Sequence, residues 1–186
     1  MTEDRSISRQ VESSGFYEHN LLIYSDLDTF SDTYCAYTKK HLLPPHNEIV
    51  VIVTYYQKVD KVLSNLSDQG IDVDREMAAG NLVVLDSVAS YHAEDTHTYV
   101  LKLAESLVEK SADDAKGGVC VFGDGGSFFL LDKIAELLQY ERSIPPKPGL
   151  KLKTFCSYHQ GDYKRLSEEE KKMLVTNHFR RIQTNE

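Results

Sequence analysis

The stretch VCVFGDGGSFF, Val119 to Phe129, decides the fold class of this chain. An apolar run ends in Gly-Asp-Gly-Gly-Ser, and a helical pattern follows it. A strand that passes through a glycine-rich turn into a helix is the repeating unit of α/β proteins, many of which hold a phosphate at such a turn. The stretch therefore predicts a strand–turn–helix unit and raises the question of whether a nucleotide binds there.

Other apolar runs rich in β-branched residues lie on both sides of this stretch. The runs at 48–56, 81–87 and 118–124 are nearly continuous in Val, Ile and Leu, which is typical of strands buried on both faces of a parallel sheet. Two more runs lie at 21–26 and, with more polar residues, at 151–159. The alternation of strands and helices predicts an α/β fold, a three-layer α/β/α sandwich with a mostly parallel central sheet of five or more strands.

Apolar residues at helical spacing lie between the predicted strands. They predict helices around 59–66, 100–108 and 130–138, and a further helix over 27–42. Ser167 to Glu170 forms a capping box, which predicts a last helix from residue 168 to about 180. The predicted helix over 27–42 turns four residues inward: Leu27, Phe30, Tyr34 and Tyr37.

The length of the chain favours one domain. It has 186 residues, of which 41% are hydrophobic, enough to bury a substantial core. Residues 1–15 are polar and predict a flexible N-terminal tail. We expect a single domain over 16–182 and a short C-terminal tail over 183–186.

Charge and cysteine content exclude several classes of function. A net charge of −8 disfavours direct nucleic-acid binding and anionic membrane surfaces, both of which attract clustered Lys and Arg. Residues 1–15 lack the apolar segment of a signal peptide. The three cysteines are widely spaced and form no metal-ligand motif. We therefore expect a cytoplasmic protein with no bound metal and no membrane partner.

Ligands of parallel α/β sheets bind beyond the carboxyl ends of the strands. Tyr and Asp are frequent at these predicted ends, whereas Lys and Arg are missing there. Aromatic walls with a few directed polar groups are typical of small-molecule sites. The predicted ligand-binding residues at the strand ends are Tyr24, Asp26, Tyr55, Asp86, Tyr91, Gly123, Asp124 and Tyr158.

The glycine-rich turn lacks the marks of a nucleotide site. No G-x-x-x-x-G-K-[ST] motif is present in the sequence, and Phe128 stands where G-x-G-x-x-G requires its last glycine. Asp124 would repel a phosphate. We favour a tight turn in which Gly supplies unusual backbone angles. No nucleophile elbow is present either, so we predict neither an enzyme nor a cofactor.

Three segments together resemble a known family. They are HNLLIY at 19–24, VFGDGG at 121–126 and FCSYHQGDYKRLSEEEKKMLVTNH at 155–178. In this order they resemble the MEDS domain, a sensory domain named after methanogens, methylotrophs and the regulator DcmR. The similarity covers roughly residues 16–182. Asp124 departs from the pattern, because the family usually carries the longer Glu at this turn.

The resemblance implies a RecA- and KaiC-like domain that has lost its phosphate loop, with Tyr24 to Asp26 in the place of that loop. It also implies a sensory input module rather than an ATP hydrolase. Relatives are often fused to histidine kinases or DNA-binding domains, so we expect a kinase or transcription regulator as the protein partner. On this interpretation His19 and His178 act as polar latches of the ligand site.

Three functions from different classes follow. The leading one is a stand-alone sensory domain that binds a small molecule or a partner protein without catalysis. The first alternative is a nucleotide-binding protein or enzyme that uses the turn at Gly123–Ser127. The second alternative is a non-catalytic assembly module, with the run at 151–159 as an exposed edge strand and a homo-oligomer as the product.

Overall fold

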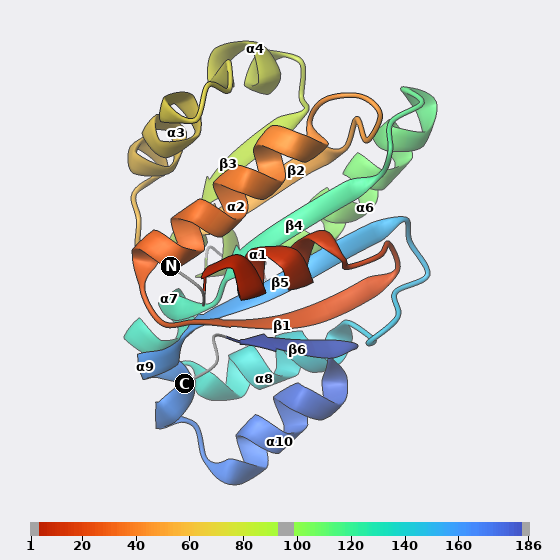
Figure 1. The fold of residues 1–186 in the computed structure, drawn as a ribbon. Coiled ribbons are helices and arrows are strands. Elements are labelled where there is room, and N and C mark those ends of the chain that lie inside the picture. Colours follow the sequence, from red (N-terminus) through yellow and green to blue (C-terminus); the bar gives the residue numbers. More distant parts are fainter. Residues whose placement is uncertain (1–3, 93–98, 184–186) are drawn as a thin grey trace.

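Six parallel strands form the centre of the molecule. The fold is that of a computed structural model, in which residues 4–92 and 99–183 are described. The strands are β1 (Glu18–Tyr24), β2 (Ile49–Thr54), β3 (Leu82–Asp86), β4 (Val119–Asp124), β5 (Leu152–His159) and β6 (Arg180–Gln183). Within the described residues they pair in the order β3-β2-β4-β5-β1-β6, and every pair is parallel (Figure 1).

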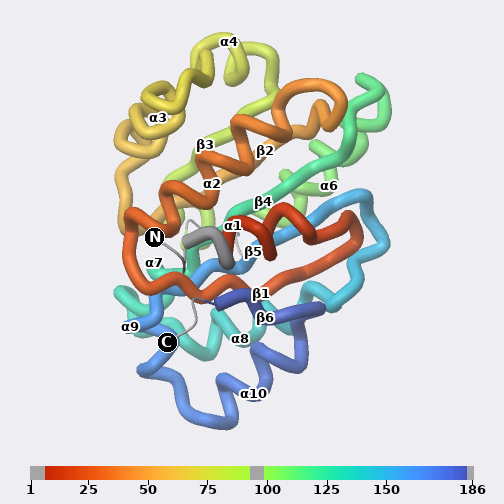
Figure 2. Tube along the Cα trace, viewed as in Figure 1, coloured from red at the N-terminus to blue at the C-terminus, as the bar shows by residue number. Residues whose placement is uncertain are grey.

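Helices cover both faces of this sheet, as the traces in Figures 1 and 2 show. The helices are α1 (Asp4–Glu12), α2 (Leu27–His41), α3 (Val59–Asp68), α4 (Val73–Ala78), α5 (Ser87–His92), α6 (Tyr99–Asp113), α7 (Gly126–Leu130), α8 (Ile134–Ser143), α9 (Gln160–Arg165) and α10 (Glu168–Asn177). Side chains of α1, α2 and α3 share one core with Val50 and Ile52 of β2. Those of α6, α8 and α10 share the other with Val51 and Val53. Successive strand residues point to opposite faces, so the predicted three-layer α/β/α sandwich is confirmed.

None of the described helices is long and apolar enough to cross a membrane.

The predicted helix over 27–42 is α2, and its Phe30, Tyr34 and Tyr37 are buried as expected. The predicted capping box is also present, because the Ser167 side chain accepts from the Glu170 N–H while the Glu170 carboxylate accepts from the Ser167 N–H. This cap fixes where α10 begins.

The single helix predicted over 130–138 is wrong. Asp132 adopts a left-handed conformation with φ of 55°, and this residue separates α7 from α8. The N–H of Lys133 donates to the carbonyl of Phe128, which closes α7. Leu130 and Leu131 are 62% and 41% exposed, so neither belongs to the buried stripe. The apparent helical spacing joined residues of two separate helices.

Residues 1–15 are not a loose tail throughout. Helix α1 occupies Asp4–Glu12 and packs against α2 and β6. Ile7 and Val11 lie one turn apart and are almost completely buried, at 1% and 0% exposure. A stripe of so few apolar side chains leaves most of the segment polar, which explains the failed prediction.

The C-terminal segment also differs from expectation. Helix α10 ends at Asn177 rather than near 180, and His178 takes an extended conformation. The N–H of Phe179 then donates to the carbonyl of His19, and the chain continues as β6 beside β1. Strand β5 consequently lies inside the sheet between β4 and β1, not at an edge. This removes the edge strand on which the assembly hypothesis depended.

A buried ion pair closes the amino end of the sheet. Glu48 is 2% exposed and precedes β2, and the β5 residue Lys153 is 3% exposed. Lys153 donates to Glu48 Oε1 over 3.2 Å, Tyr37 donates to Oε2 over 2.5 Å, and His41 Nδ1 lies 2.9 Å from Oε1. Burial opposes ionisation of Glu48, but the bond to His41 and the charge of Lys153 lower its pKa below the usual value.

We predict that Glu48→Gln lowers the free energy of unfolding by about 3–5 kcal/mol, because it leaves the buried ammonium of Lys153 without its counter-charge. The double variant Glu48→Gln/Lys153→Met should recover most of this loss. Urea denaturation followed by circular dichroism measures both. Lys40→Met breaks the exposed ion pair with Glu12 and should cost less than about 1 kcal/mol. A Glu48→Gln loss no larger than that of Lys40→Met would refute the role of the pair.

Candidate functional site

Asp124 is the centre of the carboxyl edge of the sheet. It ends β4 and is 1% exposed. Its Oδ1 accepts from the N–H of Gly126 over 2.9 Å, and its Oδ2 accepts from the Tyr24 hydroxyl over 3.3 Å. The N–H groups of Tyr55 and Tyr56 lie 3.4 and 3.5 Å from the same oxygen. These four donors tie the ends of β1, β2 and β4 to one carboxylate.

The four groups that donate to the carboxylate of Asp124 are one hydroxyl and three backbone N–H groups, and none of the four is positively charged. Burial raises the pKa of Asp124 to about 6, although the N–H groups of Gly126, Tyr56 and Tyr55 and the Tyr24 hydroxyl oppose this shift. Burial and the nearby Asp124 charge also raise the pKa of Tyr24, which keeps its proton on the shared bond. The centre of the edge is therefore acidic and repels an incoming anion.

A second carboxylate joins this cluster from α9. Tyr56 donates to Asp162 Oδ2 over 2.5 Å, and Asp162 is buried. The His159 ring lies 5.5 Å from the rings of both Tyr24 and Tyr56. We call Tyr24, Tyr55, Tyr56, Asp124 and Asp162 the edge cluster. It holds α9 against the ends of β1, β2 and β5.

Glycines of the turn make room for tyrosines rather than for a phosphate. A Cβ on Gly125 would lie 2.7 Å from the ring of Tyr158, and one on Gly126 would lie 2.3 Å from the ring of Tyr55. Neither glycine has a positive φ, so the prediction that they supply unusual backbone angles is wrong. Close packing requires them instead.

A polar chain leads away from the turn through two buried hydroxyls. Ser87 donates to the carbonyl of Asp124 over 2.9 Å and lies 2.7 Å from the Ser127 hydroxyl. His92 Nε2 is 3.0 Å from that same Ser127 hydroxyl. Burial, helped by the charge of Lys133, lowers the pKa of His92. The chain satisfies buried polar atoms, and Ser127 at 0% exposure presents no surface to a substrate.

The predicted ligand-binding residues separate into several groups. Tyr24, Tyr55 and Asp124 do meet in the edge cluster. Asp26 and Asp86 are exposed and serve as helix caps, accepting the N–H of Thr29 and of Ala89 respectively.

Two other predicted residues lie on a small internal cavity. Tyr91 and Gly123 line it on the α6 face of the sheet, and its volume is about 30 Å³. The Tyr91 ring is buried and packs against Phe128 and Tyr140. A cavity of this size holds about one water molecule and no metabolite.

Of the remaining three predicted residues, Tyr158 lies near the carboxyl end of β5, whereas His19 and His178 lie away from this edge. His19 belongs to the start of β1, where it pairs with Thr154, and His178 follows α10. Both imidazoles contact Glu141 of α8, and Tyr158 donates to the same carboxylate. The expected place of His19 and His178 as latches at the carboxyl ends of the strands is therefore wrong. Glu141 went unnoticed because a lone Glu in a helical stretch resembles a surface residue.

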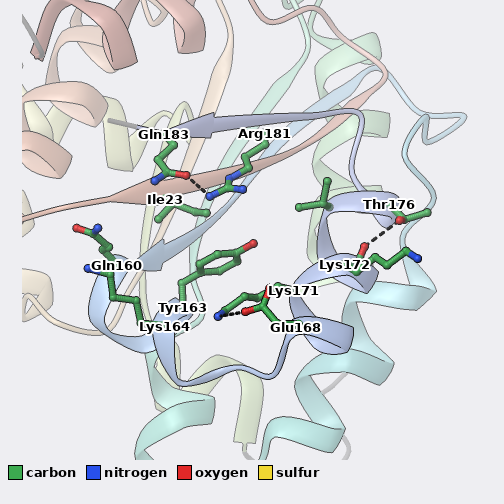
Figure 3. Close-up of a pocket in the computed structure, with 11 residues that line it drawn as sticks. Ile23, Gln160, Tyr163, Lys164, Glu168, Lys171, Lys172, Thr176, Arg181 and Gln183 are labelled. Carbon is green, nitrogen blue, oxygen red and sulfur yellow. Dashed lines mark hydrogen bonds and ion pairs between the residues drawn. The ribbon is translucent and has the colours of Figure 1, made fainter. Parts of the chain in front are cut away.

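An open cleft lies beside α9. It has a volume of about 460 Å³ and runs between β6, α9 and α10. Figure 3 shows Tyr163 standing between the β6 residue Arg181 and the α10 residues. Arg181 lies 5.3 Å from the Tyr163 ring centroid, and Lys171 donates to Glu168 over 2.8 Å. The lining residues are Ile23, Gln160, Tyr163, Lys164, Glu168, Lys171, Lys172, Val175, Thr176, Arg181 and Gln183.

Sequence reasoning missed this cleft for a physical reason. The predicted ligand site lies at the strand ends, where the sequence has no Lys or Arg. The cleft instead is lined by four basic residues, Lys164, Lys171, Lys172 and Arg181. Their signal in the sequence is that of ordinary exposed helix residues. Tyr56 and Asp162 carried a weak signal, because Tyr56 follows Tyr55 at a strand end and Asp162 follows β5 by three positions.

Comparisons with known proteins agree with this fold. The family model described as MEthanogen/methylotroph, DcmR Sensory domain (MEDS) matches residues 18–178. No curated protein matches the chain. The fold is similar to that of the uncharacterized protein PH0321 from Pyrococcus horikoshii, solved in complex with an unknown peptide, with a TM-score of 0.60 and 13% identity over 94% of this chain and 80% of that chain. At this identity the similarity shows the fold alone.

We predict that Asp124 makes the folded protein less stable as the pH rises from about 4 to 7. The folded state holds a proton up to about pH 6, while the unfolded chain releases it near its ordinary pKa of 3.8, so unfolding releases a proton in this window. The difference in pKa corresponds to about 3 kcal/mol. Asp124→Asn carries no titrating group, so wild type should lose up to that amount relative to the variant across the window.

Urea denaturation of both proteins at pH 4, 5, 6 and 7 checks this prediction through the difference in unfolding free energy. Asp60→Asn, which removes an exposed carboxylate from α3, is the matched control. A wild-type-minus-variant difference that stays constant over the four pH values would contradict it.

Proposed function

Because the chain belongs to the MEDS family of sensory domains, we propose that it is a sensory domain that binds a small anionic molecule in the cleft between β6, α9 and α10. The observation that carries this proposal is the charge of the cleft. The lining has four basic side chains and one carboxylate, that of Glu168, although the net charge of the chain is −8. The basic residues are Lys164, Lys171, Lys172 and Arg181. Concentrated positive charge in a concave site favours carboxylate or phosphate groups.

The shape of the cleft supports a small ligand. A volume of about 460 Å³ lies within the usual range of small-molecule sites, roughly 300–1,000 Å³. Ile23, Val175 and the ring of Tyr163 offer apolar contacts, whereas Gln160 and Gln183 offer amide groups that could fix an orientation. Arg181 is well suited to hold a carboxylate or phosphate through two parallel hydrogen bonds.

Helix α10 is the element that we infer to carry the signal. It supplies Lys171, Lys172 and Thr176 to the cleft, yet Leu174 is its sole buried residue. A helix held by so little buried apolar surface costs little free energy to displace. A ligand that prefers one position of α10 shifts the population toward it and changes the surface that a kinase or transcription regulator reads.

Binding without catalysis is part of the proposal. The cleft lining contains no histidine or cysteine, and its one carboxylate, that of Glu168, already accepts a hydrogen bond from Lys171. The nucleotide alternative has less support, because tyrosine rings fill the space beside Gly125 and Gly126 and the N–H of Gly126 already donates to Asp124.

We predict that a subset of small carboxylates or phosphates raises the melting temperature and that their neutral amide analogues do not. Arg181→Gln combined with Lys172→Gln should weaken binding at least about tenfold, since a hydrogen bond to a charged group contributes about 1.5–3 kcal/mol. Thermal-shift screening followed by calorimetry measures both effects. Lys102→Gln on α6 removes an exposed charge away from the cleft and is the control.

Three outcomes would reject the proposal. No anion in the panel shifts the melting temperature, or the neutral analogues bind equally well, or Lys102→Gln weakens binding as much as the double variant. ATP and GTP, each with and without magnesium, form a separate arm of the screen. Binding of either nucleotide that Asp124→Ala alters but the cleft variant does not would favour the nucleotide alternative instead.

A further inference from the structure

Four metal-ligating side chains meet inside the molecule, away from the proposed cleft. His19 comes from β1, Glu141 from α8 and Cys156 from β5, while His178 directly follows α10. One donor atom of each lies within 4.8 Å of the donors of the others. The residues are 0%, 1%, 7% and 5% exposed, respectively. Residues 137 positions apart in the sequence are thus brought into direct contact.

When the imidazole of His178 is neutral, no positive charge faces the carboxylate of Glu141 from this ring. His178 Nδ1 donates to the carbonyl of Leu174 over 2.6 Å, so the neutral ring carries a lone pair on Nε2. That nitrogen lies 3.3 Å from Glu141 Oε2, and neither atom makes a hydrogen bond. A lone pair facing a buried carboxylate oxygen is repulsive unless the imidazole takes up a proton or a cation lies between the two atoms.

The contacts of His19 converge on one point. Its Nε2 lies 3.1 Å from the Cys156 sulfur and 3.3 Å from Glu141 Oε2. In a nucleophilic Cys–His–acid arrangement the thiol and the acid contact opposite nitrogens of the ring. Here both contact the same nitrogen, which is the arrangement of ligands around an ion.

The observed spacings fit a tetrahedral ion. Bonds of about 2.0–2.3 Å to nitrogen, oxygen and sulfur separate the ligand atoms of a tetrahedral zinc site by roughly 3.3–3.7 Å. The contacts of Glu141 Oε2 with His19 and with His178 measure 3.3 Å each, and that of His19 with Cys156 measures 3.1 Å.

Surrounding groups fix the donors in place. Tyr158 donates a short hydrogen bond to Glu141 Oε1, which leaves Oε2 directed at the two histidines. The bond from His178 to Leu174 selects the tautomer whose Nε2 can bind a metal. Partners of this kind, one layer out from the ligands, are the usual companions of metal-binding histidines and carboxylates.

We propose that His19, Glu141, Cys156 and His178 form a buried four-ligand site for a divalent transition metal, with Zn²⁺ as the best match. Two imidazoles, a thiolate and a carboxylate suit zinc or cobalt rather than Mg²⁺ or Ca²⁺, which prefer oxygen ligands alone. Four protein ligands in a buried place form a closed, structural site. The metal would join β1, β5 and α8 to the residue that ends α10.

A second group of donors serves as the comparison. His41, His46 and Glu48 also lie within ligand distance of one another. There, Lys153 already supplies a positive charge to Glu48, and Tyr37 donates to its other oxygen. That carboxylate has the cation it needs, so we expect no metal at this second place.

The test uses the full chain without a polyhistidine tag, produced in zinc-supplemented cells and, separately, refolded with Co²⁺, because buried metals enter as the chain folds. We expect about one zinc per chain by elemental analysis. The cobalt form should show the near-ultraviolet charge-transfer band of a thiolate ligand and the visible bands of a tetrahedral ion. Cys156→Ser should remove the charge-transfer band, and His178→Gln should weaken metal binding at least about tenfold.

Cys35→Ser and His46→Gln are the matched controls, since they remove a buried thiol on α2 and a histidine of the second group. Both should keep the metal and the band. The proposal is overturned if wild type contains no metal and its cobalt form lacks the charge-transfer band. It is equally overturned if the metal survives both Cys156→Ser and His178→Gln, or leaves with His46→Gln. Should a ligand variant not fold, the wild-type cobalt spectrum alone decides. None of these measurements depends on the proposed cleft or its ligand.

Discussion

The carboxylate of Glu141 joins helix α8 to three other segments, namely β1, β5 and the residue that follows α10. Tyr158 donates to one of its oxygens, and His19 and His178 face the other. Burial by itself would raise the pKa of this carboxyl group, but positive charge on His178 and His19, when these imidazoles are protonated, lowers it below the ordinary value. A buried charge of this kind requires partners, and Glu141 has them on β1, on β5 and directly after α10.

Among the buried carboxylates, Glu48, Asp124 and Glu141 lie at different heights along the strands, and each is stabilised differently. Glu48 at the amino end has the ammonium of Lys153. Asp124 at the carboxyl end has backbone N–H groups and the Tyr24 hydroxyl, and its pKa is raised accordingly. Glu141 lies between these levels on the α8 face, where imidazoles face it. The different partners explain why we expect a metal ion at Glu141 and none at Glu48, whose counter-charge is already present.

The cleft and the Glu141 cluster both involve helix α10. Helix α10 lines the cleft through Lys171, Lys172 and Thr176, and its C-terminal cap, His178, belongs to the buried cluster. Leu174 is its sole buried residue, and α10 is held by the capping box at Ser167, by partly buried Met173, by the bonds from Asn177 to the carbonyls of Glu141 and Ile144, and by His178. The proposed function requires that a ligand in the cleft shift the position of α10.

Local patterns in the sequence were sufficient for the layers of the fold. Runs of Val and Ile predict strands buried on both faces, and apolar side chains one turn apart predict helices, because both periods act over a few neighbouring residues. The same reasoning failed at Asp132, where a left-handed residue divides α7 from α8, and at His178, where the chain leaves a helix to become a strand. The meeting of Tyr24 with Asp124 was predictable from the rule that strand ends share one edge.

Only the tertiary structure decided which distant side chains meet on the faces of the sheet. Strand order is set by the packing of whole layers, and no local period reports that β5 lies beside β1. That pairing brings Cys156 to His19, and the helices that cover this face add Glu141 and His178. The cationic cleft arises in the same way, from helix residues that look like an ordinary solvated surface until β6 folds back beside them. The composition and the spacing of apolar residues in the sequence therefore determined the architecture. The order of the strands and the packing of the helices on them determined which reactive side chains meet.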